Sequence, residues 1–317
     1  MNYWLKGIRA WLPVVFSLSL LVLGILKFDV LGDLLKKKEY SEDVTSSLSG
    51  ETHSKSSKTN PSESMNSRKE YESVAKSKFQ LRGVGENLLY FMPNEKKPYD
   101  GWLKEQSEDG ILEVWKVKNG SKHGEYSTWY ENGQKCYEVY YEFGKKEGKW
   151  KKWHQNGQLA LLGFYLSDRL EGQLLTWYAD GKMNLKSNYE KGLLHGDFSH
   201  WYANKKIKEI GNYERGKKSG VFTEWDTKGC KILQCEYFED LLDGNYSVWF
   251  ENGKIKHQNS YSRGSKEGVY EGWYDNGEKS YEGNYRIGEK DGVWIFFNED
   301  GTVLHRKSYL QGREVGN

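Results

Sequence analysis

The stretch GVYEGWYDNGEKSYEGNYRIGEKD, residues 268–291, decides the fold of this chain. It predicts a strand over about Val269–Tyr274, a tight turn at Asp275-Asn276-Gly277, and a second strand over about Glu278–Arg286. Asparagine and glycine accept the positive φ that two-residue hairpin turns require. A second reversal over Gly288–Gly292 leads into the next stretch, so the unit is predicted to be one β-hairpin.

This unit recurs eight times without an insertion. Counted from the unit glycine, a tyrosine follows at position 17, and a tryptophan (phenylalanine in the last unit) follows at position five. The glycines that mark the period of 24 are Gly124, Gly148, Gly172, Gly196, Gly220, Gly244, Gly268, Gly292 and Gly316. Such a strict period is typical of arrays in which each unit stacks only on its neighbours. We therefore predict an all-β repeat array, in which tandem hairpins form an elongated, twisted antiparallel ribbon.

The recurring tryptophans and tyrosines are predicted to form the structural core. Period two places the tyrosine at position 17 on the same strand face as a mostly small residue at position 15, which leaves room for a flat ring. We expect that ring to be the tryptophan at position five of a neighbouring strand. The predicted core residues are Trp129, Tyr141, Trp153, Tyr165, Trp177, Tyr189, Trp201, Tyr213, Trp225, Tyr237, Trp249, Tyr261, Trp273, Tyr285 and Tyr309.

A further set of rings at positions two and six is expected on the face away from the tryptophans. Two interpretations stay open for these rings: cross-strand packing that stiffens the ribbon, and a contact surface for a protein or a glycan. The candidate binding row at position six consists of Tyr130, Tyr178, Tyr202, Phe250 and Tyr274.

A few units depart from the pattern. The turn Ala203-Asn204-Lys205 lacks the turn glycine, which we expect to strain that hairpin by ~1 kcal/mol. Asp168 and Asp240 replace the glycine of the connector between units, and Phe297 takes the place of the last tryptophan. We interpret these changes as drift, with the last unit as a cap, rather than as a site.

Composition supports a scaffold rather than a charged binding domain. The 317 residues include 23 Tyr and 13 Trp, whereas hydrophobic residues make up only 37%, so broad rings must replace an aliphatic core. With 47 basic and 45 acidic residues the net charge is +2, which excludes a global field for nucleic acid. The three cysteines, Cys136, Cys230 and Cys235, are odd in number and irregularly spaced, so we predict packing roles and no disulfide.

The N-terminal region, residues 1–35, carries 17 uncharged residues from Ala10 to Leu26. A helix of that length spans ~26 Å, slightly less than a hydrocarbon core of ~30 Å. We predict an uncleaved signal anchor that crosses the membrane once; a cleaved signal peptide, giving a secreted protein, and a buried soluble helix are the alternatives. Positive charges on both sides of the run leave its orientation open, and we favour extracytoplasmic repeats, in the periplasm or at the cell surface.

Between this run and the array the composition changes twice. Residues 36–78 are rich in Ser, Lys and Glu and poor in apolar residues, which predicts a disordered linker. Residues 79–123 are interpreted as degenerate hairpins that precede the eight units of residues 124–317.

The pattern G-x-aromatic-x-x-W-Y-x-N-G, followed by Tyr and G-K-K-x-G, resembles the MORN-repeat-variant family. HGEYSTWYENGQKCYEVYYEFGKKEG, residues 123–148, is a close match, and the resemblance covers about residues 80–317. It implies a bacterial β-hairpin ribbon that acts as an interaction scaffold. Some members carry a toxin–antitoxin antitoxin label, and related MORN repeats are linked to binding of membrane lipids or proteins.

No catalytic or metal site is predicted. The seven histidines occupy solvated turn positions or unrelated offsets, and no Walker loop, nucleophile elbow, H-E-x-x-H or paired-cysteine motif occurs. We predict no enzyme activity, no cofactor and no nucleic-acid partner. The predicted function is a membrane-tethered scaffold for protein–protein interaction. The alternatives are a cell-wall or carbohydrate-binding module that uses exposed rings, and an antitoxin-like partner of a toxin; self-association through an uncovered sheet edge also stays open.

Overall fold

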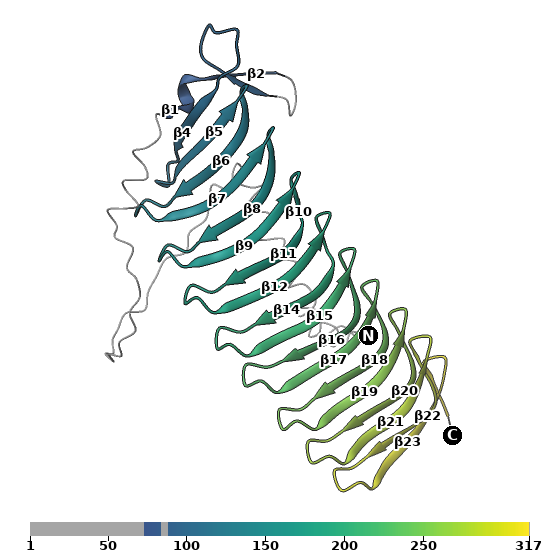
Figure 1. Cartoon of the computed structure of the whole chain (residues 1–317). Helices are drawn as coiled ribbons and strands as arrows, with labels where there is room; N and C mark the ends of the chain where they lie inside the picture. Colours follow the sequence, from purple (N-terminus) through teal and green to yellow (C-terminus); the bar gives the residue numbers. More distant parts are fainter. Residues whose placement is uncertain (1–72, 84–87, 317) are drawn as a thin grey trace, which may run out of the picture. The chain divides into compact units, whose positions relative to one another are not determined.

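A computed structural model describes residues 73–83 and 88–316 of the chain. These residues form one sheet of 22 strands and a separate two-stranded sheet of β2 (Gln80–Arg82) and β3 (Leu89–Phe91). From β5 onward each strand of the large sheet pairs antiparallel with an earlier strand, in sequence order (Figure 1). The predicted all-β array of tandem hairpins is therefore confirmed. The predicted N-terminal helix lies outside the described residues.

The predicted linker ends earlier than Lys78. Strand β1 (Ser73–Ala75) pairs in parallel with β4 (Gly101–Gln106), and a 3-10 turn, η2 (Lys76–Lys78), follows it. Regular structure starts at β1 because this segment can pair with the free edge of β4. Directly after it, the ring of Phe79 packs against the ring of Tyr99, with 4.6 Å between the two ring centroids. Composition alone does not register such a short edge strand.

Eight hairpins follow β5 (Leu112–Lys118), one for each 24-residue unit. Their strands are β6 (Ser121–Trp129) and β7 (Lys135–Glu142); β8 (Lys145–Trp153) and β9 (Leu159–Leu166); β10 (Arg169–Leu170) with β11 (Gly172–Trp177) and β12 (Met183–Glu190); β13 (Leu193–Leu194) with β14 (Gly196–Trp201) and β15 (Ile207–Glu214); β16 (Lys217–Trp225) and β17 (Lys231–Phe238); β18 (Leu241–Trp249) and β19 (Ile255–Ser262); β20 (Ser265–Trp273) and β21 (Lys279–Arg286); β22 (Glu289–Phe297) and β23 (Val303–Leu310). The short β24 (Arg313–Val315) pairs with β23 at the end of the sheet.

The two-residue turns lie between units, not within them. At the connector, Ile287 and Gly288 have φ of 52° and 80°, the paired positive values of a type I′ turn. At Asp275-Asn276-Gly277, the N–H of Gly277 donates to the carbonyl of Tyr274 and that of Tyr274 donates to the carbonyl of Glu278, which makes a three-residue loop. The prediction of a two-residue turn there was wrong, because Asn-Gly also fits a type I turn that ends on a left-handed glycine.

The aspartates that replace the connector glycine are accommodated by a hydrogen bond. Asp168 and Asp240 adopt φ of 67° and 70°, as the glycines do. Their carboxylates accept from the backbone N–H groups of Lys146 and Lys218, each at 2.7 Å, in the preceding connector. Aspartate tolerates this conformation better than most residues because its short side chain can form such local bonds.

The unit glycine lies inside a strand, where the ladder is interrupted. Gly292 has φ of 73°, and the pairing of β21 with β22 shifts between Glu282 and Asn284 opposite it. No atom lies within 4 Å of the Cβ that Gly292 would carry, so backbone conformation alone selects glycine here. The prediction that Gly288–Gly292 forms the reversal is corrected: the chain reverses at Ile287-Gly288, and Gly292 forms a β-bulge.

One face of the sheet, the ring face, is packed by an alternation of large and small side chains. In each hairpin the large residue at position two is directly opposite the residue at position 15, as in Trp150 with Gly163 and Phe222 with Cys235. The large residues are Tyr126, Trp150, Leu174, Phe198, Phe222, Tyr246, Tyr270 and Trp294. Trp150, Phe198 and Phe222 are at most 1% exposed, so this row is the centre of the core.

The ring that covers the small residue is therefore not the tryptophan at position five. A Cβ on Gly283 would lie 2.2 Å from the Trp294 ring, and one on Gly211 would lie 2.3 Å from the Phe222 ring. Within a hairpin the paired positions add up to 17 as far as position four, so position 15 faces position two. Position five is odd and therefore lies on the other face of its strand. The tyrosines at position 17 do lie on the ring face; Tyr165 and Tyr189 are 4% and 5% exposed.

Replacing Lys205 with glycine is expected to stabilise the array by about 1 kcal/mol. Lys205 has φ of 70° at the position where the other loops carry glycine, so its Cβ is strained against the backbone. Equilibrium urea unfolding of the two proteins measures the gain. The neighbouring Lys206→Gly is the matched control and is expected to lose stability, because Lys206 does not adopt positive φ; equal effects of both changes would contradict the assignment.

Candidate interaction surface

The candidate binding row at position six lies at the hairpin loops and connects successive units. The hydroxyls of Tyr130, Tyr178 and Tyr202 donate to backbone carbonyls 23 residues further on, at 2.9, 2.7 and 2.9 Å. Tyr274 donates to Phe297 in the same way at 2.8 Å, whereas Phe250 has no hydroxyl to donate. These bonds give the row a structural role between hairpins. That the same rings contact a partner stays a prediction.

A second ladder of asparagines runs beside the tyrosines. At position eight the side-chain amide donates to a carbonyl 23 residues further on, as Asn132 does to Gln155 at 3.1 Å and Asn276 does to Glu299 at 2.8 Å. The asparagine thus forms one hydrogen bond within its own loop and another to the loop of the next unit. Sequence reasoning assigned only the first, although the period of 24 in this residue is visible.

The tryptophans at position five lie on the face away from the rings, which we call the opposite face. Trp129 is 6% exposed, and the other indoles at this position are half-buried. The ammonium of Lys135 lies between two of them, 5.8 Å from the Trp129 ring and 5.9 Å from the Trp153 ring. Such cation–π contacts hold the lysine stem along the indoles and stabilise this row without closing it from solvent.

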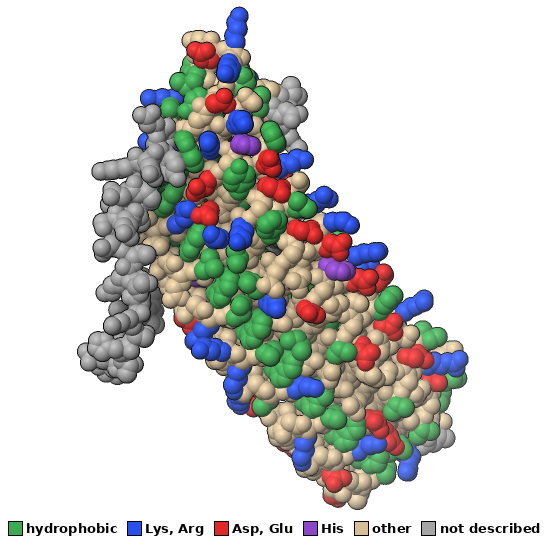
Figure 2. Space-filling model, viewed as in Figure 1, with side chains coloured by type: hydrophobic (Ala, Val, Ile, Leu, Met, Phe, Trp, Pro, Cys, Tyr) green, Lys and Arg blue, Asp and Glu red, His purple; other side chains and the backbone are tan. Residues whose placement is uncertain are grey.

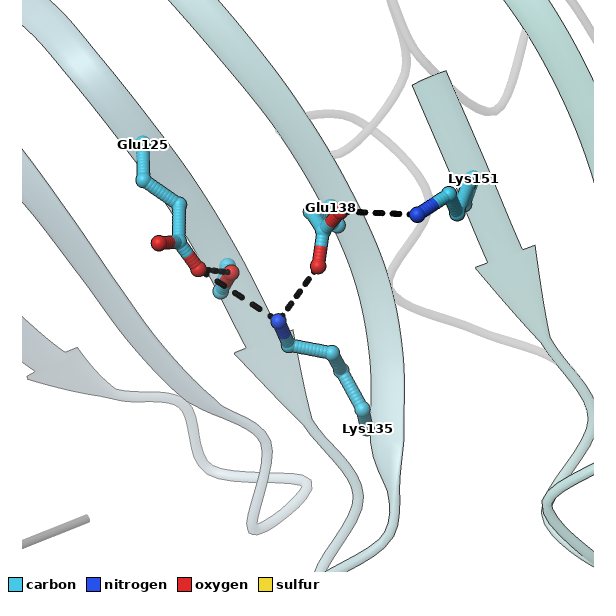
Figure 3. A network of polar contacts seen from close by, with 5 residues as sticks. Glu125, Lys135, Glu138 and Lys151 are labelled. Carbon is cyan, nitrogen blue, oxygen red and sulfur yellow. Dashed lines mark hydrogen bonds and ion pairs between the residues drawn. The ribbon is translucent and has the colours of Figure 1, made fainter. Parts of the chain in front are cut away.

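Near the start of the array, the opposite face carries a network of charges (Figure 3). Lys135 pairs with Glu138 at 2.5 Å and with Glu125 at 3.3 Å, and Lys151 pairs with Glu138 at 3.3 Å. Burial alone would raise the pKa of Glu138, but the hydrogen bond and charge of Lys135 and then Lys151 lower it. The network is internally neutralised, so it is a poor docking site for a charged partner.

The next strands change character on the same face. Strand β9 reads Leu159-Ala-Leu-Leu-Gly-Phe-Tyr-Leu166, with no polar residue on either face. Its side chains on the opposite face include Phe164 and Leu166, which are 41% and 47% exposed, and Leu162 is directly opposite Leu175 of β11. We call Leu162, Phe164, Leu166 and Leu175 the β9 patch. A strand that is apolar on both faces is typical of sheets covered on both sides.

Three cations border the β9 patch. In register, Lys149 is opposite Phe164, Arg169 is opposite Leu166 and Lys186 is opposite Leu175. Among residues 73–83 and 88–316, none of the three forms an ion pair. The combination therefore differs from the neutralised network beside it, and it is complementary to an apolar surface with acidic groups. On the face drawn in Figure 2, hydrophobic side chains likewise lie among charged ones along the array.

The ring face contains a polar cluster that sequence reasoning missed. Registers place His200 opposite Glu209, and Glu209 opposite Glu224; no other unit has a carboxylate at either of these two repeat positions. Glu209 is 2% exposed, and Lys218 pairs with it at 3.2 Å while its ammonium lies 4.3 Å from the Phe222 ring. Burial, and then the charge of Glu209, raises the pKa of Glu224. A glutamate at a repeat position that the other units fill with Leu, Tyr or His was the available signal.

This cluster predicts a loss of stability in mild acid. Burial, and then the charge of Lys208, lowers the pKa of His200 to about 4, whereas the unfolded chain binds that proton near pH 6.5. The free energy of unfolding therefore falls as pH drops from 6.5 to about 4, by about 2–3 kcal/mol for His200. Glu224 acts in the opposite sense, because its raised pKa makes folding more favourable in acid.

The comparison that isolates the histidine is urea unfolding of the parent and of His200→Leu at several pH values. The difference in stability between the two proteins is expected to shift in favour of the leucine variant between pH 6.5 and 4. His195→Leu is the control, since His195 is exposed. If the difference in stability between the two proteins does not change with pH, His200 binds its proton equally well in the folded and in the unfolded protein, which would contradict the prediction.

The described part of the chain offers little for catalysis. Over residues 73–83 and 88–316, no three His, Cys, Asp or Glu side chains come together in a group able to hold a metal ion. The three cysteines are free thiols, and Cys235 is buried in the ring row at 2% exposure.

One comparison with known proteins identifies the repeat. Five stretches match the repeat described as MORN repeat variant: residues 122–144, 146–166, 170–191, 194–215 and 242–262. No curated protein matches the sequence. A solved structure described as "Crystal Structure of TcdB2-TccC3-Cdc42" is similar at 10% sequence identity and a TM-score of 0.12, over 74% of this chain and 18% of that chain. The match thus spans less than a fifth of that chain.

Proposed function

We propose, from the membership of this repeat array in the MORN repeat variant family, that the chain is a non-catalytic scaffold that binds a protein through the β9 patch. Repeats of this family are generally interaction repeats, which supports a scaffold. The observation that carries the more specific proposal is the β9 strand, whose apolar side chains lie on both faces of a single sheet. Water contact with Phe164 and Leu166 is unfavourable, and a covering partner would remove it.

The proposed partner has an apolar surface with acidic groups at its edge. Lys149, Arg169 and Lys186 would then form charge pairs at the rim of the contact, where they add specificity and association rate more than affinity. The apolar centre would supply most of the binding free energy.

Membrane tethering remains part of the proposal and rests on the sequence alone. The apolar run Ala10–Leu26 is outside the described residues. In residues 73–83 and 88–316, no helix has the length and apolarity needed to span a membrane. Protease treatment of intact cells tests the tether and its orientation: digestion of a membrane-bound array from outside supports extracytoplasmic repeats, and protection until lysis would favour an intracellular partner, including a toxin.

Photocrosslinking at Phe164 tests the proposed binding surface. With p-benzoylphenylalanine at this position in the full chain, irradiation of cells is expected to give one discrete protein adduct, identified by mass spectrometry. Lys149→Glu together with Lys186→Glu should reduce its yield at least tenfold, since each lost rim pair becomes a repulsion. The same amino acid at Val293, 55% exposed on the same face, is the control.

Two outcomes would overturn this assignment. One is an adduct at Phe164 that is no more abundant than at Val293, or that is unaffected by the charge changes. The other is crosslinking to lipid in place of protein, which would assign the patch to a membrane surface. The β9 patch does not favour the carbohydrate alternative, because an uncharged sugar matches neither its apolar centre nor its cations. It does not favour the toxin alternative either, because nothing in the patch identifies a toxin as the partner.

A further inference from the structure

A stretch of the opposite face further along the array has a different chemistry. The central row of this face crosses β16, β17, β18 and β19 as Thr223, Gln234, Ser247 and Gln258, each directly opposite the next. No member of this run carries a charge, whereas the same row has Glu138 and Lys151 near its start and Glu271 and Glu282 after it. Four consecutive strands thus present hydroxyl and amide groups in alternation.

A hollow of about 260 Å³ opens over these strands. Its lining consists of Val221, Gln234, Glu236, Asn245, Ser247 and Gln258. Five of the six side chains form hydrogen bonds, and the one apolar residue, Val221, is 48% exposed. The hollow is slightly smaller than a typical drug-sized site of ~300–1,000 Å³, so it fits a small polar group or one unit of a longer chain.

The lining groups are held in place by their neighbours and keep hydrogen-bonding capacity. The Asn245 amide donates to one oxygen of Glu236 at 2.9 Å, and the Gln258 amide donates to the Ser247 hydroxyl at 3.3 Å. The Lys231 ammonium donates to the amide oxygen of Gln234 at 3.1 Å. Each amide has two donor hydrogens and an acceptor oxygen, so these single bonds leave further donors and acceptors for a ligand.

An aromatic ring borders the same region. Trp249 follows Ser247 by two residues on β18 and therefore lies on the same face. The Lys231 ammonium, 4.8 Å from the Trp249 ring, connects this indole to Gln234. Amides, a hydroxyl, one carboxylate and an indole thus meet on a surface with a single nearby cation.

From this arrangement we propose that the hollow is a subsite for a neutral saccharide. A sugar hydroxyl both donates and accepts, as the amide and hydroxyl side chains of the lining do, and it carries no charge that would need a counter-ion. A nucleic acid would need more cations than Lys231, and a protein contact normally buries an aromatic or aliphatic anchor, which this mostly polar lining does not match. The site is separate from the β9 patch and does not depend on the function proposed for that patch.

The repeat predicts that the ligand is an oligosaccharide. Gln234 and Gln258 occupy the same position of successive units, which two strand spacings place ~9.6 Å apart. A chain of linked sugars can reach both amides at once, and each further contact then becomes intramolecular. Oligosaccharides should therefore bind more tightly than the corresponding monosaccharides.

Saturation-transfer NMR and isothermal titration calorimetry on the full chain test the proposal. The probes are N-acetylglucosamine, cellotetraose, maltotetraose and the tetramer of N-acetylglucosamine. At least one tetramer is expected to bind, and Gln234→Leu with Gln258→Leu should weaken it about tenfold, as expected for two lost hydrogen bonds. Gln173→Leu makes the same change at an exposed site on β11 and should leave binding unchanged.

Thermal unfolding checks that each variant is folded; if the double variant is not, the single change Asn245→Leu at an exposed position takes its place. Absence of binding for all four probes at millimolar concentration would overturn the proposal. Equal binding by the parent and the folded hollow variants would also overturn it, as would equal weakening by Gln173→Leu. Failure of the photocrosslinking experiment at Phe164 would leave this site unaffected, so the two proposals fail separately.

Discussion

Gly283→Val is expected to destabilise the array by at least ~3 kcal/mol, toward the upper end of what overpacking a core costs. A Cβ at this position would lie 2.2 Å from the ring of Trp294, a distance that no real contact reaches. Trp294 is itself 2% exposed and in contact with Tyr285 and Tyr309, so it has no free direction in which to move. Urea unfolding followed by circular dichroism measures the loss.

The matched control is Gly316→Val, the same change at a glycine with no atom within 4 Å of its Cβ position. It is expected to stay within ~0.5 kcal/mol of the parent. A double-mutant cycle adds a second check: Trp294→Leu alone is destabilising, but in the Gly283→Val background it should cost less, because the smaller side chain leaves room for valine. Equal effects of Gly283→Val and Gly316→Val would contradict the packing described for the ring face.

The second large effect is expected at Lys218→Met, which should destabilise the array by about 3–5 kcal/mol at neutral pH. The side chain of Glu209 is 3% exposed, and its carboxylate forms an ion pair with Lys218 at 3.2 Å. Methionine keeps the packing against Phe222 but leaves the carboxylate charged and unpaired beside Glu224.

The array provides its own control for this experiment. Lys266 occupies the same repeat position two units later, and its ammonium lies 4.4 Å from the Tyr270 ring. The position that Glu209 has in its unit is taken there by His257, which is opposite Gly272. Lys266→Met should therefore cost only ~0.5–1 kcal/mol, the size of a cation–π contact. Adding Glu209→Gln to Lys218→Met should restore most of the stability. Similar losses for the two lysines would mean that the rings, and not Glu209, need the ammonium.

The repeat itself could be predicted because its residues report backbone geometry directly. Glycine at a fixed period, with Asn-Gly or Asp-Gly in most of the loops, specifies eight hairpins, and the structure has them. The tyrosines at position 17 were also assigned to the correct face relative to the small residues, since that inference stays within one strand and needs only period two.

What failed was inference across strands. Placing Trp294 over Gly283 requires the register of two strands, which depends on the bulge at Gly292. The sequence had been interpreted with this glycine in the chain reversal. A shift of one residue exchanges the two faces, so the indoles at position five were assigned to the wrong one. Glu209 was overlooked for a related reason: its burial comes from its position in the ring face, and a glutamate in a strand otherwise indicates a solvent-exposed side.

The β9 patch and the neutral row of the opposite face lay beyond sequence reasoning as well. Both depend on side chains from four neighbouring strands, and only a settled register brings Leu162 to Leu175 or Gln234 to Ser247. The sequence of β9 did carry a visible signal, namely a run of apolar residues without alternating polar ones. Such a run is not expected in a single sheet with one face open to solvent.

The strictly sequential pairing of the strands has a consequence for synthesis on the ribosome. From β5 onward, each strand finds its earlier partner within the preceding unit of the chain. At ~5–20 residues per second, one 24-residue unit takes about 1–5 s to emerge, whereas a hairpin forms in ~1–10 μs. Each newly emerged hairpin can thus dock on a finished template before the next one appears, and the nascent protein never needs to hold more than one unpaired unit.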